Sequence, residues 1–94
     1  MDTNEPVAGP PVVMYSSGWC PYCMRARALF ERKGIALMEI KVDEHPQERD
    51  TMLARSGGRR TVPQIFVGDR HVGGFDDLYA LEQAGELDKL LGRA

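Results

Sequence analysis

The sequence has little cysteine, no long apolar segment and no clustered positive charge. Its two cysteines lie in one short motif, so we do not expect a secreted scaffold held together by several disulfides. No apolar segment approaches the roughly 20 residues that cross a bilayer, and a membrane is therefore not an expected partner. The formal net charge is -2 with no extended run of Lys or Arg, so nucleic acid is not an expected partner either.

Length and composition indicate a single small domain. The 94 residues, 43% of them hydrophobic and 28% charged, suffice for one core and are too few for two. Residues 1–11 are rich in proline and predict a poorly ordered lead-in, which places the domain at residues 12–94. The lead-in lacks the basic start and apolar centre of a secretory signal, so we expect a cytoplasmic protein. Chain size alone favours a monomer.

The first part of the domain shows a strand, helix, strand pattern. Residues 12–15 form a β-branched and aromatic run that is typical of a buried strand. Residues 21–33 favour a helix, and Gly34 suits the left-handed position that ends it. Residues 36–42 alternate with the two-residue period of a second strand. Such a unit predicts that the two strands are parallel.

The second part adds a helix and a hairpin before the C-terminal helices. Residues 46–56 predict a helix, and residues 64–67 and 70–73 predict two strands. The Gly68-Asp69 link between these strands suits a type II′ turn, which makes them antiparallel. From Asp76 onward the pattern predicts a helix and a short closing helix, so the predicted order is βαβαββα.

The two cysteines form the motif Cys20-Pro21-Tyr22-Cys23 at the start of a predicted helix. A thiol has an ordinary pKa of about 8.5, but the unpaired N–H groups and positive dipole of a helix N-terminus favour its thiolate. We therefore predict that Cys20 is the nucleophile. Cys23 lies one turn inside the helix, where it is placed to resolve a mixed disulfide.

Two other roles for such a cysteine pair are a zinc site and a structural disulfide. A zinc site needs two further ligands, for which only His45 and His71 are available, so no metal is expected. A structural disulfide across so short a loop removes little unfolded-state entropy and is disfavoured in a reducing compartment. A CxxC motif within a βαβ pattern favours redox chemistry instead.

The order of several motifs resembles that of dithiol glutaredoxins over residues 12–91. After the cysteine motif come Thr61-Val62-Pro63, Gly73-Gly74 and Asp76-Asp77, at the approximate spacing of that family. The resemblance implies an α/β fold of the thioredoxin-like type. Its mixed four-stranded sheet has the order 2-1-3-4, with helices on both faces. The resemblance also implies a cis peptide bond between Val62 and Pro63.

The same resemblance implies a groove for glutathione, which acts as the co-substrate. The residues expected to bind it are Tyr22, Arg60, Thr61, Val62, Pro63, Gly74, Phe75, Asp76 and Asp77. The Val62 backbone would meet the cysteinyl part of glutathione, while Asp76 and Asp77 with the adjoining backbone would hold its γ-glutamyl amino and carboxylate groups. Two positions depart from the family. Ser17 replaces a common lysine, and Trp19 replaces a small polar residue. Arg25, Arg27, Arg59 and Arg60 are candidate electrostatic substitutes for that lysine, and among them we predict Arg60.

By this resemblance the protein reduces protein–glutathione mixed disulfides and protein disulfides. Its partners would be glutathione and those disulfide-containing proteins, with glutathione reductase and NADPH supplying electrons indirectly. Three alternatives stay open. They are an electron donor served by thioredoxin reductase, a carrier in which two subunits hold an iron–sulfur cluster through Cys20 and glutathione, and a non-catalytic binding module. The glutathione motifs argue against the thioredoxin reductase partner, and Pro21 argues against the iron–sulfur carrier. The presence of both thiols argues against a non-catalytic module.

Overall fold

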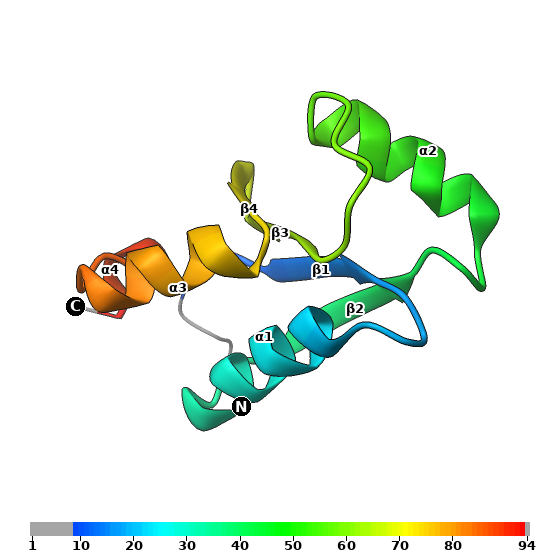
Figure 1. Cartoon of the computed structure of the whole chain (residues 1–94). Helices are drawn as coiled ribbons and strands as arrows, with labels where there is room; N and C mark the ends of the chain where they lie inside the picture. The colour runs from blue at the N-terminus through cyan, green and yellow to red at the C-terminus, as the bar shows by residue number, and fades with distance from the viewer. Residues whose placement is uncertain (1–8, 94) are drawn as a thin grey trace, which may run out of the picture.

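The computed structural model describes residues 9–93, and its elements follow the predicted order (Figure 1). Residues 1–8 of the predicted lead-in lie outside the described residues. Every boundary predicted above lies within one residue of the observed one. The elements are β1 (Val12–Ser16), α1 (Pro21–Arg32), β2 (Leu37–Lys41), α2 (Pro46–Arg55), β3 (Gln64–Val67), β4 (Arg70–Gly73), α3 (Phe75–Gln83) and α4 (Leu87–Leu90).

The four strands form one mixed sheet in the order β2-β1-β3-β4, as expected. β1 and β2 are parallel, with Val12 opposite Leu37, and β3 is antiparallel to both β1 and β4. At the hairpin turn Gly68 has a φ of 58°, and no residue other than glycine has positive φ in the described part of the chain. These angles agree with a type II′ turn, in which only the first central residue needs positive φ.

Helices cover both faces of the sheet because successive residues of a strand point to opposite sides. Val12 and Met14 face a core cluster that also contains buried residues of α1, α3 and α4. Tyr15, the next residue along β1, faces a smaller cluster with Met52 of α2. Accordingly, α2 lies on one side of the sheet and α1 and α3 on the other (Figure 1). No helix within residues 9–93 is long and apolar enough to span a membrane.

α1 is the element that carries the cysteine motif. Its buried residues Cys23, Ala26, Leu29 and Phe30 recur at helical spacing and form one stripe against the sheet. Pro21 occupies the first turn, where its missing N–H removes no helical hydrogen bond. Gly34 follows the helix with a φ of 69°, the left-handed conformation expected from the sequence. Burial of this stripe therefore holds the N-terminus of α1, and Cys20 with it, at one end of the core.

The last residues of the predicted lead-in contact the domain. The Gly68 N–H donates to the carbonyl of Pro11 at 2.8 Å, which joins this segment to the hairpin turn. Gly9 has a φ of 113°, and a Cβ at this position would lie 2.3 Å from the carbonyl oxygen of Leu91. The approach of Gly9 to the C-terminal segment therefore requires glycine.

Candidate active site

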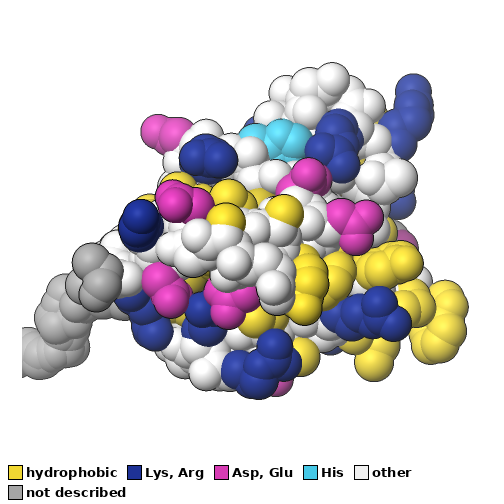
Figure 2. All heavy atoms as spheres, turned by 60° about the vertical axis from the view of Figure 1, so that its left-hand side comes forward, with side chains coloured by type: hydrophobic (Ala, Val, Ile, Leu, Met, Phe, Trp, Pro, Cys, Tyr) yellow, Lys and Arg dark blue, Asp and Glu magenta, His cyan; other side chains and the backbone are white. Residues whose placement is uncertain are grey.

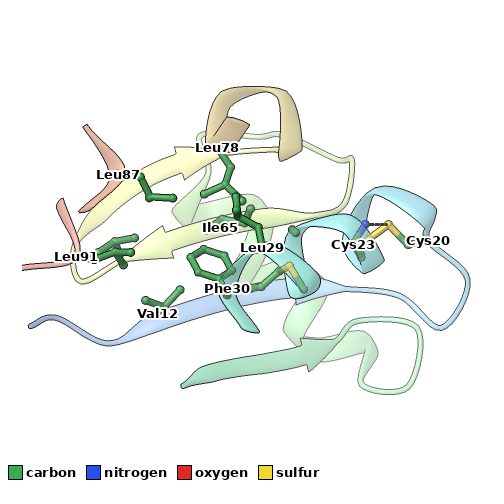
Figure 3. Packing of buried hydrophobic residues seen from close by; sticks show 12 residues of the cluster. Val12, Cys20, Cys23, Leu29, Phe30, Ile65, Leu78, Leu87 and Leu91 are labelled. Atoms are coloured by element: carbon green, nitrogen blue, oxygen red, sulfur yellow. Dashed lines mark hydrogen bonds between the residues drawn. A yellow bond between two sulfur atoms is a disulfide. The ribbon is translucent and has the colours of Figure 1, made fainter. Parts of the chain in front are cut away.

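Cys20 and Cys23 form a disulfide at the start of α1, at one end of the hydrophobic core (Figure 3). Cys20 is the N-cap residue and Cys23 lies in the first turn, with their Cα atoms 5.1 Å apart. Cys20 is 7% exposed and Cys23 is fully buried. The more accessible sulfur therefore belongs to the residue predicted to be the nucleophile.

The backbone around Cys20 is arranged to stabilise a thiolate once the disulfide is reduced. The Cys23 N–H points to Cys20 Sγ at 3.1 Å. This donor and the dipole of α1 both favour negative charge on that sulfur. In addition, the first turn of α1 contains no acidic residue that would oppose it. The geometry suits Cys20 to attack a substrate disulfide and Cys23 to attack the mixed disulfide that results.

A loop of residues 61–63 lies directly beside the disulfide. The carbonyl oxygen of Val62 is 3.7 Å from Cys20 Sγ. A disulfide sulfur carries no hydrogen, so this is a van der Waals contact in the oxidised protein. The Val62–Pro63 bond is cis, which confirms the expectation from the resemblance. The backbone of this loop is therefore within reach of any group joined to Cys20.

Next to this loop lies a groove of about 490 Å³. It brings together residues from the start of α1, the loop before β3 and the start of α3. The lining residues are Tyr22, Arg59, Thr61, Val62, Pro63, Gly74, Phe75, Asp76 and Asp77. Eight of the nine residues predicted to bind glutathione are among them. The exception is Arg60, which is exposed outside the lining, while its neighbour Arg59 occupies the groove.

Asp77 organises one end of the groove. Its Oδ2 accepts a hydrogen bond from the Gly74 N–H at 3.0 Å and lies 3.6 Å from Arg59 Nη1. Gly73 makes this arrangement possible, since it has a φ of 116° and a Cβ there would lie 2.2 Å from Asp77 Oδ2. Glycine at position 73 is thus required by the close approach of an acidic side chain to the backbone.

The start of α3 offers groups of both signs to a ligand. The N–H groups of Phe75, Asp76 and Asp77 belong to the first turn, where the helix supplies no carbonyl partner for them. Such N–H groups bind carboxylates, and the positive end of the helix dipole assists. The acidic side chains of Asp76 and Asp77 attract a positively charged amine. This end of the groove therefore suits a molecule that carries an amino group next to a carboxylate.

A buried hydrogen-bond network supports the 61–63 loop from below, and the sequence did not reveal it. The fully buried Gln64 donates from Nε2 to the carbonyl of Thr61 at 3.0 Å. Its Oε1 lies 2.7 Å from His71 Nε2 on β4. Because Oε1 can only accept, His71 Nε2 must carry a proton. The sequence marks Gln64 only as the first residue of a strand and His71 only as a hairpin residue.

His71 is held in a largely apolar and positively charged setting. Its ring stacks on Phe66 with the ring centres 4.7 Å apart. Burial lowers the pKa of His71 below its usual value, and the positive charges of Arg59 and Arg55 lower it further, whereas Asp77 opposes them. The imidazole therefore favours its neutral form.

Two acidic residues without a predicted role accept hydrogen bonds from residues of β1, of the loop after it and of α1. Asp43 Oδ2 accepts from the Gly18 N–H at 3.0 Å and anchors the loop that leads to Cys20. Glu39 accepts from Arg27 Nε at 2.8 Å and from the hydroxyl of buried Ser16. The Arg27 hydrogen bond lowers the pKa of Glu39, with Ser16 contributing less. Arg27 is therefore occupied away from the groove.

The two departures from the family pattern lie in the loop before the disulfide. Ser17 donates from its hydroxyl to the Trp19 carbonyl at 3.3 Å, so its side chain supports the loop without adding a charge. Trp19 is 83% exposed.

Within residues 9–93, no three His, Cys, Asp or Glu side chains are grouped as a metal site would require.

Comparisons with known proteins agree with this geometry. The Glutaredoxin family profile matches residues 12–72. A glutaredoxin from Pseudomonas aeruginosa is 57% identical over 82 residues, which cover 87% of this chain and 96% of that protein. The solution structure of glutaredoxin from Brucella melitensis is 51% identical with a TM-score of 0.78, covering 94% of this chain and 95% of that one.

A structure described as a buckwheat glutaredoxin–glutathione complex is also similar. That structure is 30% identical in sequence to this chain and has a TM-score of 0.80 to it. The match covers 90% of this chain and 83% of that one. The profile match contains the cysteine motif and the 61–63 loop, and the matches to these three proteins cover 87–94% of this chain. The chain therefore belongs to the glutaredoxin family, and its paired cysteines are those of a thiol–disulfide oxidoreductase.

Proposed function

We propose that this protein is a dithiol glutaredoxin that uses glutathione to reduce protein–glutathione mixed disulfides and protein disulfides. The contact between Val62 and Cys20 carries the proposal. Val62 lines the groove, and its carbonyl lies 3.7 Å from the reactive sulfur. A ligand in the groove thereby reaches Cys20 while its amino and carboxylate end meets Asp76 and Asp77. Glutathione has a thiol near its centre and this pair of charged groups at one end.

Glutathione mixed disulfides need only the first cysteine. The Cys20 thiolate attacks the glutathione sulfur, forms a Cys20–glutathione disulfide and releases the protein thiolate, which takes up a proton. A second glutathione, as its thiolate, attacks the glutathione sulfur of that disulfide. Glutathione disulfide leaves and the Cys20 thiolate is restored. The Cys23 N–H stabilises the sulfur each time it carries negative charge.

Protein disulfides need both cysteines. The Cys20 thiolate attacks one sulfur, joins that half of the substrate and releases the other as a thiolate. Cys23 then attacks Cys20 Sγ, which releases the remaining protein thiolate and leaves the Cys20–Cys23 disulfide. Two glutathiones reduce this bond and become glutathione disulfide. Glutathione reductase then reduces this glutathione disulfide with electrons from NADPH. We place the cycle in a reducing, cytoplasmic setting with a monomeric protein.

Arg59 takes the electrostatic role that the sequence suggested for Arg60. It lines the groove and lies 3.6 Å from Asp77, so its position is set by a partner within the site. A guanidinium group there attracts a carboxylate of the bound peptide. We therefore assign Arg59 to a carboxylate of glutathione, and Arg60 serves as the matched control for it.

The test is NADPH oxidation in a coupled assay with glutathione, glutathione reductase and a small glutathione mixed disulfide. We expect the Cys20→Ser variant to lose activity and Cys23→Ser to retain much of it while losing reduction of protein disulfides. Arg59→Gln should raise KM more than Arg60→Gln. Replacing glutathione and its reductase with thioredoxin reductase is the control. Turnover with thioredoxin reductase alone would show that the glutathione groove is wrongly assigned.

A further inference from the structure

A second hollow lies beside the groove, between α1 and α3. Its volume is about 220 Å³, and its lining residues are Arg25, Ala28, Leu29, Arg32, Phe75 and Tyr79. Phe75 also lines the groove, so the two hollows share this residue. The hollow is therefore a lateral extension of the active site rather than a separate region.

Stacked aromatic rings join the hollow to the cysteine motif. Tyr22 stacks on Phe75 with centroids 6.2 Å apart, and Phe75 stacks on Tyr79 at 5.8 Å. Tyr22 and Tyr79 are 53% and 49% exposed. Figure 2 shows hydrophobic and basic side chains side by side at one edge of the molecule. Exposed aromatic rings next to arginine are the composition that recurs at the centre of protein interfaces.

The charged residues that line the hollow are both positive. Arg25 lies over the Tyr22 ring at 5.3 Å and Arg32 lies seven residues further along α1, so both reach the same side of the helix. Neither forms an ion pair with a carboxylate among residues 9–93, in contrast to Arg27. Glu82, one turn beyond Tyr79, is paired at 2.8 Å with Lys33, which also pairs with Asp88, so Lys33 offsets part of the charge of Glu82. The overall net charge of -2 makes this local positive surface distinctive.

We infer that this hollow docks an acidic segment of the protein substrate, next to the substrate cysteine whose disulfide Cys20 attacks. The inference rests on the proposed function, which it extends to the choice of protein substrate. A helical rise of 1.5 Å per residue puts Arg25 about 7 Å and Arg32 about 18 Å from Cys20 along α1. An extended chain advances about 3.3 Å per residue. Carboxylates about two and five residues from the reacting cysteine therefore meet the two arginines, with an apolar residue between them on Phe75 and Tyr79.

The experiment compares glutathionylated peptides of equal length with Glu or Lys at those positions on both sides of a central cysteine. At low salt we expect kcat/KM for the acidic peptide to exceed that for the basic peptide about tenfold, and high salt to reduce the difference. The R25E/R32E variant should reverse the preference. An R49E/R70E variant has the same change in net charge on exposed residues outside the hollow, and it should keep the preference.

A small glutathione mixed disulfide separates this inference from the proposed function. If the unmodified protein fails to turn it over, the glutathione assignment itself is wrong. If it is turned over but the two peptides react equally, only the docking inference is overturned. The ratio of the two peptide rates cancels any change in Cys20 reactivity. An equal loss of the acidic preference in the R49E/R70E variant would assign the effect to net charge and refute a docking surface.

Discussion

Replacing Gln64 by Leu removes the centre of the network beneath the active-site loop. Gln64 is fully buried and joins Thr61 to His71 through hydrogen bonds of 3.0 and 2.7 Å. Each such bond contributes about 1 kcal/mol net, so the substitution should cost about 2 kcal/mol of the free energy of unfolding. Thr61 is exposed and its carbonyl regains water, whereas half-buried His71 is left with an unsatisfied ring nitrogen.

Urea unfolding and thermal melting measure this loss. In a domain of this size, about 2 kcal/mol corresponds to a fall in Tm of roughly 8–16 °C. The exposed Gln47 is the matched control, and Gln47→Leu should change the free energy of unfolding by less than about 0.5 kcal/mol. Because the loop contacts Cys20, KM for the small mixed disulfide should rise in the Gln64 variant alone.

A double-mutant cycle with His71→Leu tests whether the two residues act through one another. Because a hydrogen bond joins them, the double variant should lose about 1 kcal/mol less than the sum of the single variants. Additive losses would show that each residue contributes only by packing. A Gln64→Leu protein as stable as the original would refute the whole account of the loop's support.

Three further predictions concern other contacts of the site. Because the pKa of His71 is lowered in the folded protein, His71 contributes stability that is present above about pH 6.5 and lost as pH falls through the folded pKa. Urea unfolding from pH 5 to 8 should show this slope, and His71→Phe should flatten it. Arg27→Met should raise the pKa of the Glu39 carboxyl in an NMR titration, since the Arg27 hydrogen bond is the main cause of its lowering; an unmoved titration would contradict that cause. Gly73→Ala places a Cβ 2.2 Å from Asp77 Oδ2 at positive φ, so it should destabilise the protein by more than about 1 kcal/mol and raise KM for glutathione substrates. Unchanged Tm and KM would argue against the close approach.

The elements and the cysteine chemistry were predictable because they depend on local patterns. The apolar run of β1, the alternating residues of β2 and the helical stripe of α1 appear directly in the sequence, and so do the glycines that end α1 and form the hairpin turn. The position of Cys20 at a helix N-terminus follows from the proline after it and the strand before it. The sheet order and the cis bond came from the resemblance, because neither follows from local periodicity.

Side-chain partners distant in sequence were not predictable in the same way. The sequence offers two adjacent arginines before Thr61, and their local pattern does not distinguish them; only the folded loop places Arg59 by Asp77 and leaves Arg60 outside the groove. Asp43 resembles any loop carboxylate until the sheet brings it to the Gly18 N–H. A polar residue at the start of a strand likewise gives no sign that it will be fully buried.

The sequence by itself determined that this chain is a small α/β domain with a reactive cysteine pair at the start of a helix, because hydrophobic period, turn residues and motif spacing act over short distances. Tertiary structure decided what surrounds those cysteines. The chain reversals between β1, β3 and α3 bring Val62, Asp77 and the aromatic rings to Cys20, and the same packing leaves Arg25 and Arg32 facing a hollow. These juxtapositions depend on the closure of long loops around one core, and their energies arise only when the core has formed.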